Sequence, residues 1–501
     1  MKTNLNRRDF IKSSALFAAG TLAMRGKMFG KNNLNKFMAS KPNIIFIMAD
    51  DLGYSDLGCY GQLNIKTPEL DKMAAEGIRF TRHYSGSPLC GPARTSLMTG
   101  KHTGHTSVRQ NKVSKLLPGE KTLGTVLKSA GYTTGSIGKW GVGWDLPSND
   151  PGERGFDHFY GYVNQTHAHN YYTSFLYRNG KREQLSNVVP GEVLEGPEEG
   201  KGYATVRKEY THNLFTEDAL KFVEDNKKDP FFLHLCYTTP HVNNDATRGN
   251  KFELPEINGK PDLGIYTDKE NWDYSMKAYA ALISMMDRDI GRILEKLREL
   301  KLDENTIVFF TGDNGPHREG NYNPHKLNGT GSLRGGKFNF YEGGLRVPLI
   351  ARWPKHIESG TTTDHPSAFW DFMATACELS GVDKPSDCDG ISYLPSLLGK
   401  RNQKEHEYLY WERHIPGLRQ SYQALRWGDW KGYRVIDHDK FDDPKYKPQL
   451  ELYDLFRDEE ENFNVALSHK EIVNKIEKLM ADAHVDDPTG NLPAIPSFLN
   501  N

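Results

Sequence analysis

The chain has 501 residues, and its 64 lysines and arginines nearly balance 65 aspartates and glutamates, for a formal net charge of −1. Without an overall positive field the chain is not expected to bind nucleic acid, and an anionic substrate must be held by a local cluster of cations. Hydrophobic residues make up 37% of the chain. After the N-terminal segment, no run approaches the roughly 20 apolar residues of a membrane span.

The N-terminal residues have the pattern of a targeting segment. NRRDFIK is followed by the apolar, small-residue run SSALFAAGTLA, which is the layout of an export signal with a twin-arginine motif. An ordinary amphipathic helix is the alternative. We expect residues 1–40 to form an export signal and connector, and the mature protein to be exported to the periplasm without stable membrane insertion.

Helices and strands alternate over residues 41–394. The apolar run at 43–48 predicts a strand buried on both faces of a sheet. Amphipathic helices are predicted over residues 67–76, 121–131, 211–229 and 276–300, and each of the last three precedes an apolar strand segment. This alternation predicts an α/β fold with a large mixed, mostly parallel sheet covered by helices on both faces.

A different pattern begins near residue 395. YLYWERH, YQALRWGDWKGYRV and LELYDLF are short, aromatic and nearly alternating, which predicts antiparallel strands. The helical sequence EIVNKIEKLMADAH follows them. We expect residues 395–490 to form a smaller C-terminal α+β subdomain containing an antiparallel sheet, and residues 491–501 to form a tail.

Polar side chains stand at the ends of the predicted strands of the large sheet, where ligands bind in folds of this class. Hard oxygen donors of this kind suit Ca²⁺ or Mg²⁺, although each one is also a good turn or cap residue. Arg94, Lys139 and Lys337 are candidate ligands for a tetrahedral oxyanion, the alternative being ordinary solvated cations. The oxygen donors are Asp50, Asp51, Asp313 and Asn314, and His241 ends another strand.

The five cysteines, at positions 59, 90, 236, 377 and 388, are too scattered for a disulfide framework or a zinc site with paired spacing. A bond between Cys377 and Cys388 remains an open alternative. Cys90 lies in the turn-rich sequence SPLCGPAR, at the start of a predicted helix. This is an unusual place for a structural cysteine, because structural cysteines are normally found in apolar elements.

The segment CGPARTSLMTGKHTGH resembles the signature of type I, formylglycine-dependent sulfatases, an arylsulfatase-like family of the alkaline phosphatase superfamily. Similar segments follow the family's order over roughly residues 42–480. They are PNIIFIMADDLGYSDLGCYG, GYTTGSIGKWG, PFFLHLCYTTPH, TGDNG, LRGGK with YEGGLRVPLIARWP, and RWGDWK with ELYDL. The resemblance implies a sulfatase catalytic domain over residues 41–394.

The resemblance also implies the chemistry. A maturation enzyme would oxidise Cys90 to formylglycine (3-oxoalanine), whose hydrate attacks the sulfur of the ester with metal activation. Arg94 would steady the formylglycine, Lys139 and Lys337 would bind the sulfate oxygens, and His241 would protonate the leaving oxygen. The implied Ca²⁺ ligands are Asp50, Asp51, Asp313, Asn314 and the group derived from Cys90.

One position departs from the family pattern. Gly141, in GKWGVG, stands where members commonly have a histidine that assists breakdown of the sulfated intermediate. His317 is the favoured replacement base, and His167 or His169 are further candidates. These three histidines are also expected to contact substrate, the alternative being a structural role.

The aromatic, histidine-rich segment at residues 160–178 is a candidate carbohydrate subsite, with a packed loop as the alternative. We therefore expect an exported, calcium-dependent sulfatase that hydrolyses O-sulfate esters of a sulfated saccharide. The alternatives are a phosphate or phosphonate ester hydrolase of the same superfamily, or an inactive protein that binds sulfated glycans.

Overall fold

The structure is a computed structural model that describes residues 41–495 apart from 112–114, 144–145, 147–148, 247–250, 444 and 491. The expected export signal, and most of the expected tail, lie outside the described residues. Among the residues described, no helix is both long enough and apolar enough to cross a membrane.

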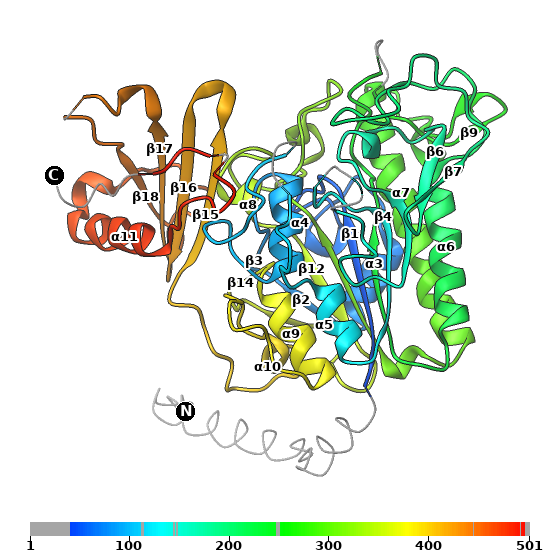
Figure 1. Cartoon of the computed structure of the whole chain (residues 1–501), viewed down its shortest axis with the longest axis horizontal. Helices are drawn as coiled ribbons and strands as arrows, with labels where there is room; N and C mark the ends of the chain where they lie inside the picture. Colours follow the sequence, from blue (N-terminus) through cyan, green and yellow to red (C-terminus); the bar gives the residue numbers. More distant parts are fainter. Residues whose placement is uncertain are drawn as a thin grey trace, which may run out of the picture. The chain divides into compact units, whose positions relative to one another are not determined.

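A ten-stranded sheet forms the centre of the fold (Figure 1). Its inner strands pair in parallel, and antiparallel pairs join toward both edges. The predicted mixed, mostly parallel sheet is thus confirmed. In spatial order the strands are β13 (Thr361–Thr363), β2 (Ile78–Phe80), β12 (Leu349–Arg352), β11 (Thr306–Gly312), β1 (Asn43–Ala49), β8 (Phe231–Cys236), β4 (Thr133–Lys139), β5 (His158–Tyr162), β6 (Phe175–Arg178) and β7 (Lys181–Gln184).

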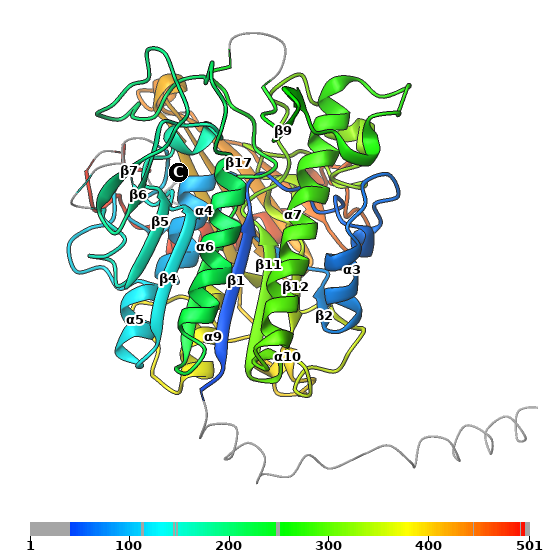
Figure 2. The same ribbon diagram turned by 90° about the vertical axis from the view of Figure 1, so that its right-hand side faces the viewer.

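Helices cover both faces of this sheet (Figure 2). Alternate side chains of β1 point to opposite faces, as the period of a strand requires. Ile45 and Ile47 join the core formed with α6 and α7, whereas the ring of Phe46 lies 4.3 Å from that of Phe372 on α9. The helices are α3 (Pro68–Ala75), α6 (Thr211–Asp225) and α7 (Tyr274–Glu299) on one side, and α4 (Cys90–Thr99), α5 (Leu123–Ser129) and α9 (Asp371–Ser380) on the other.

The strand order brings the carboxyl ends of distant segments together. β1 lies between β11 and β8, with Ala49 opposite Gly312 and Met48 opposite Cys236. The pairing continues one residue further, because Asp313 N–H donates to Ala49 O at 2.9 Å. Residues that follow β1, β11, β8 and β4 therefore meet at one edge of the sheet, as expected for parallel strands.

A four-stranded antiparallel sheet occupies the C-terminal part, as predicted from its alternating aromatic pattern. Lys431 of this sheet is fully buried, with Nζ 2.9 Å from Glu342 and 3.0 Å from Glu461. Glu342 begins the short helix α8 (Glu342–Leu345), so the ion cluster joins the two parts of the fold. The strands are β15 (Leu409–Ile415), β16 (Gln420–Trp427), β17 (Trp430–Asp437) and β18 (Leu450–Asp454), and α11 (Lys470–Ala483) packs on them.

The remaining elements are short. They are α10 (Leu394–Leu397) and two small paired ladders, β3 (His83–Tyr84) with β14 (Ser367–Ala368), and β9 (Glu256–Ile257) with β10 (Lys260–Pro261).

Candidate functional site

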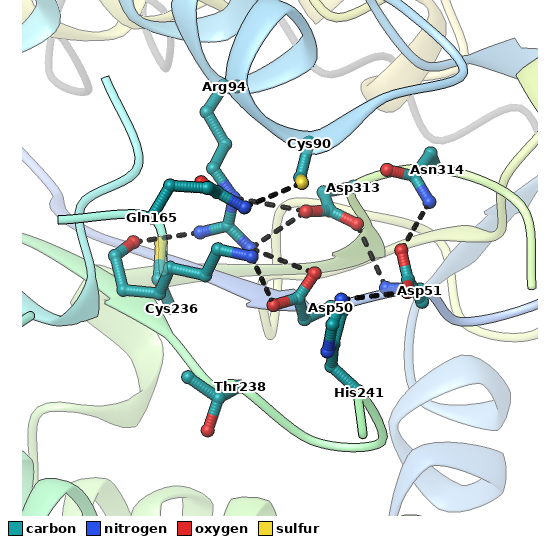
Figure 3. A network of polar contacts seen from close by, with 12 residues as sticks. Asp50, Asp51, Cys90, Arg94, Gln165, Cys236, Thr238, His241, Asp313 and Asn314 are labelled. Carbon is teal, nitrogen blue, oxygen red and sulfur yellow. Dashed lines mark hydrogen bonds and ion pairs between the residues drawn. The ribbon is translucent and has the colours of Figure 1, made fainter. Parts of the chain in front are cut away.

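Two pairs of oxygen donors meet where β1 and β11 end (Figure 3). Asp51 N–H donates to Asp313 Oδ1 at 3.0 Å, and Asn314 Nδ2 donates to Asp51 Oδ1 at 2.7 Å. Asp51 has a φ of +64°, a left-handed conformation that costs energy for a residue other than glycine and that is concentrated at functional sites. The structure thus brings together all four predicted oxygen donors.

Each of the three carboxylates has a cation against it. Arg94 Nη2 lies 2.8 Å from Asp313 Oδ2, and Lys139 Nζ lies 2.6 Å from Asp50 Oδ2. The third cation, Lys337, lies with Nζ 2.9 Å from Asp51 Oδ2 and also 2.9 Å from Glu319 Oε2. Burying one partner of such a pair without the other would be costly, so the three predicted cations are fixed in place by the acidic groups. Glu319 was not predicted.

The charges in this cluster depend strongly on one another. Burial, and then the charge of Asp50, raises the pKa of Asp313 to about 7. Burial also favours the neutral form of Asp50, but Lys139 and then His241 and Arg94 outweigh it and hold the pKa of Asp50 below its usual range. An additional positive charge between the carboxylates would relieve the repulsion that acts on Asp313.

Two buried oxygens in the cluster lack a hydrogen-bond partner, namely Asp50 Oδ1 and Asn314 Oδ1. Arg94 Nη2 lies 3.8 Å from Asp50 Oδ1. One ligand atom from each of Asp50, Cys90 and Asp313 lies within 4.8 Å of the other two. Unpaired buried oxygens next to several carboxylates fit a hard divalent cation such as Ca²⁺, which prefers oxygen ligands.

Cys90 is the first residue of α4, and its side chain points into this cluster (Figure 3). Gln165 Nε2 lies 2.7 Å from Cys90 Sγ, and Asn111 Nδ2 lies 3.5 Å from it. Burial, and then the charge of Asp50, raises the pKa of the Cys90 thiol against the opposing effect of Lys139. Cys90 is therefore a protonated thiol here rather than a reactive thiolate. All five cysteines are unpaired, including Cys377 and Cys388.

His241 lies at the edge of the cluster in a defined tautomer. Its Nδ1 lies 2.7 Å from Val242 O, and its Nε2 lies 3.0 Å from Lys337 Nζ. Since a carbonyl only accepts, Nδ1 carries the proton and Nε2 accepts from the lysine. The ring of His169 lies parallel to that of His241, with centroids 4.4 Å apart. His169 is therefore brought to the site.

Of the other two predicted histidines, His317 lies beside the site. Its ring centroid is 5.8 Å from that of His241, and one of its ring nitrogens lies within 4.8 Å of a ligand atom of Asp51 and of Glu319. His317 packs among the rings of Phe252, Tyr279 and Tyr322, and its Nδ1 accepts a hydrogen bond from the N–H of Glu319 at 3.1 Å. Burial lowers the pKa of His317, and its accepting nitrogen is already occupied. His167 is fully buried, with Nε2 2.7 Å from Thr173 Oγ1 and its ring 4.5 Å from that of Phe175. His317 is thus brought to the edge of the site, whereas His167 packs inside the fold.

Gly141 has a φ of +67°, which favours glycine. A Cβ atom there would lie 2.7 Å from Arg94 Cδ and 3.0 Å from Gln165 Oε1. A side chain at position 141 would therefore require Arg94 and Gln165 to move. Gln165 was missed in the sequence, although it belongs to the NQTHAHNYY run that attracted attention through its histidines.

The aromatic residues at 160–178 are largely buried, so the packed-loop alternative describes them better than a carbohydrate subsite does. Tyr162 and Tyr171 are 0% exposed, and Tyr160 and Tyr172 are 2% exposed. Their hydroxyls are used inside the fold, as in the 2.7 Å bond from Tyr171 to Thr238 O. Gln165 and His169 of this segment reach the site, and its tyrosine rings pack inside the fold.

Comparison with known proteins agrees with this geometry. The family model described as Sulfatase matches residues 42–382. The chain belongs to the sulfatase family. Human steryl-sulfatase is 31% identical to it over 74% of this chain and 72% of that protein. Human N-acetylgalactosamine-6-sulfatase is 32% identical over 72% of this chain and 66% of that protein. The chain is thus a sulfuric ester hydrolase.

A second family model, described as N-sulphoglucosamine sulphohydrolase, C-terminal, matches residues 336–486 of this sulfatase. The crystal structure of Ps i-CgsB is similar, with 28% identity, a TM-score of 0.72 and coverage of 90% of this chain and 95% of that one. Ps i-CgsB in complex with k-i-k-neocarrahexaose is similar at 26% identity and a TM-score of 0.73, over 90% of this chain and 95% of that one.

Proposed function

We propose that this sulfatase is exported, is converted to a formylglycine enzyme at Cys90, binds Ca²⁺, and hydrolyses O-sulfate esters of a saccharide. The observation that carries the proposal is the surroundings of Cys90. Its thiol lies at the start of a helix, beside carboxylates that are paired one by one with cations, and next to two buried oxygens without partners.

The calcium ligands would be Asp50, Asp51, Asp313, Asn314 and the group derived from Cys90. When bound, the ion would neutralise the carboxylates and polarise an oxygen of the substrate. The formylglycine, made by a maturation enzyme, would supply as its hydrate the hydroxyl that attacks sulfur.

The side chains of the chain itself position the substrate. We assign Lys139 and Lys337 to the sulfate oxygens, because their ammonium groups border the cluster on either side of Asp50 and Asp51. Arg94 is assigned to hold the modified residue, since it reaches Asp313 Oδ2 and Lys139 O at 2.8 Å each and cannot swing away. These roles use buried, fixed cations, which are effective in stabilising negative charge.

We assign proton delivery to His241 and Lys337 acting together. In this structure His241 Nε2 is an acceptor and Lys337 Nζ is the donor, at 3.0 Å. Lys337 keeps its own proton and orients Nε2 through this bond, and a proton carried by Nε2 once Lys337 binds the sulfate can protonate the oxygen of the leaving alcohol. His169, stacked on His241, would keep its ring in this orientation.

Because position 141 is glycine, the histidine that usually acts as the base for sulfate release is missing. We do not assign this role to His317, because its Nδ1 already accepts a hydrogen bond from the N–H of Glu319. We propose that Gln165 takes part of the role by donating from Nε2 to an oxygen at the Cys90 position. An amide does not accept protons at neutral pH, so Gln165 orients this group while water removes the proton. We therefore expect slow release of sulfate.

The charge of the cluster favours sulfate over phosphate. Four carboxylates, including that of Glu319, face three cationic side chains, which leaves one net negative charge when all are ionised. A divalent cation makes the sum one positive charge, which a singly charged sulfate ester balances. A doubly charged phosphate monoester would leave an excess negative charge in a buried site, which is costly.

The saccharide class is supported by the similarity to N-acetylgalactosamine-6-sulfatase and to Ps i-CgsB in complex with k-i-k-neocarrahexaose. The test is to produce the full chain with a formylglycine-generating enzyme and compare hydrolysis of an aryl sulfate with that of an aryl phosphate. We expect sulfate turnover, and turnover of phosphate alone would contradict the proposal. Mass analysis of the peptide that contains Cys90 should find formylglycine, whereas a free thiol throughout would favour an inactive glycan-binding protein.

A further inference from the structure

Arg413 is a cation near the cluster that pairs with no acidic side chain among the residues that the structure describes. Arg413 lies on β15 and is partly buried, and its Nε is buried without a hydrogen-bond partner. Its guanidinium forms no ion pair with any residue in the described ranges. The contact made by its charge is with the ring of Phe338, whose centroid lies 5.2 Å away. A buried guanidinium that is not paired is costly unless a ligand completes it.

The face of β15 that carries Arg413 also touches the cluster. Trp411, two residues earlier and hence on the same face, donates from Nε1 to Ser85 O at 2.8 Å. The hydroxyl of Ser85 in turn donates to the carbonyl of Asp313. The C-terminal sheet therefore borders the site directly, although none of its residues belongs to the cluster at the strand ends.

Phe338 connects Arg413 to the predicted sulfate-binding residues. It follows Lys337, and Lys337 Nζ lies 5.2 Å from its ring centroid, the same distance as the Arg413 guanidinium. Its N–H donates to Pro88 O at 2.8 Å, two residues before Cys90. The ring of Phe338 is thus held beside the nucleophile position, and both Lys337 and Arg413 contact it.

The conformation of Phe338 is unfavourable in two ways. Its φ is +74°, a left-handed value that is rare for a bulky residue, and its side chain is 43% exposed. Backbone strain and an exposed aromatic ring both destabilise the folded state slightly, and such features cluster at ligand sites. An exposed ring next to cations is suited to stacking on the apolar face of a sugar.

No acidic side chain on the neighbouring strands can satisfy Arg413. The residue opposite it on β16 is Tyr422, whose hydroxyl donates to Gln420. Glu412 points to the other face of β15, where it binds Arg109 and His484. Burial lowers the pKa of Arg413, and interaction with the charges of Tyr422 and Cys90 acts to raise it. The guanidinium is therefore close enough to the nucleophile position to interact with a charge there.

We propose that Arg413 and Phe338 form a subsite for a second anionic group on the sulfated saccharide, with Arg413 binding that group and Phe338 stacking on the sugar that carries it. The inference rests on the proposed function for the identity of the ligand. The planar fork of arginine binds both carboxylate and sulfate through two parallel hydrogen bonds. The second anion is therefore a carboxylate or a second sulfate, and the experiment separates the two.

The test measures binding, so that it does not depend on turnover. The full chain with Cys90→Ala, in the presence of Ca²⁺, is titrated calorimetrically with matched sugars that carry one sulfate, two sulfates, or one sulfate and one carboxylate. We expect a second anion of one or both kinds to tighten binding about 10- to 100-fold. Arg413→Met should remove this gain, and Arg413→Lys should restore only part of it, because lysine lacks the fork.

Arg419→Met is the matched control. Arg419 lies at the β15–β16 turn, is paired with Asp439 and is 66% exposed in its side chain, so its loss changes the net charge equally but should leave the gain intact. An equal gain in the Arg413→Met protein, or no gain from either second anion before substitution, would overturn the subsite. Failure of Cys90 to be modified would overturn the proposed function instead, and the binding result would still decide on Arg413.

Discussion

The strongest test of the site is removal of the Gln165 amide by Gln165→Leu. The substitution keeps the volume of the side chain but removes the donor that lies 2.7 Å from Cys90 Sγ. A buried hydrogen bond contributes about 0.5–1.5 kcal/mol net, and an unpaired buried group costs about 1–3 kcal/mol. A loss of about 1–2 kcal/mol in transition-state stabilisation corresponds to a fall in kcat of about 5- to 30-fold.

KM should change little, because Gln165 contacts the residue at position 90 rather than the sulfate or the sugar in this proposal. The assay is initial-rate hydrolysis of an aryl sulfate, with each rate divided by the formylglycine content measured by peptide mass analysis. Gln184→Leu is the control, since Gln184 is exposed at the end of edge strand β7. An unchanged kcat, or a change confined to KM, would refute the role of Gln165.

Four further predictions follow from the geometry. Cys90→Ala should lower aryl sulfate hydrolysis by more than about 1,000-fold, and substantial remaining turnover would contradict its assignment as the nucleophile. Chelation by EDTA should reduce both activity and Tm, and added Ca²⁺ should restore both, whereas indifference to EDTA would argue against a metal site. Lys431→Met removes the cation that lies between two buried carboxylates and should lower the free energy of unfolding in urea by about 3–5 kcal/mol, whereas Lys440→Met, at a lysine 59% exposed, should change it by less than about 0.5 kcal/mol. His406 lies 2.6 Å from Asp371; burial opposes its charged form, but the charge of Asp371 outweighs burial and raises its pKa. The His406–Asp371 pair should therefore stabilise the folded state fully below about pH 6.5, the unperturbed histidine pKa, and this stabilisation should disappear as the pH rises through the higher folded pKa. The free energy of urea unfolding, compared between the native chain and His406→Gln from pH 5.5 to 8.5, would check this.

The central strands and helices could be predicted because their own sequences carry the signal. β1, β8 and β11 are continuous apolar runs, and α7 shows a regular helical period. The outer strands β13, β2, β12 and β5–β7 were not predicted. β7 is mostly exposed, and β2 spans only three residues, so their pairing depends on neighbouring strands rather than on a pattern of their own.

The same distinction applies to the site. Residues at strand ends were found because parallel strands bring their carboxyl ends together, whatever the loops do. Gln165, Glu319 and Arg413 come from loops and from the C-terminal sheet, and their positions depend on tertiary packing. His317 closely follows the predicted metal-binding segment in sequence and does reach the edge of the site beside His241. Its packing against Tyr279 and Tyr322 could not be predicted, because it too depends on tertiary contacts.

The buried cluster of Lys431, Glu342 and Glu461 has a consequence for how such enzymes can diversify. The two family matches overlap at residues 336–382, and this stretch begins with Lys337 and Phe338 and contains Glu342. A functional chimaera between relatives should therefore be joined before residue 336, so that the ion cluster and the strand that carries Arg413 are inherited as one piece. If Arg413 and Phe338 form the proposed subsite, exchange of that piece would alter which sulfated sugar is chosen while Cys90, Arg94 and Lys139 stay the same.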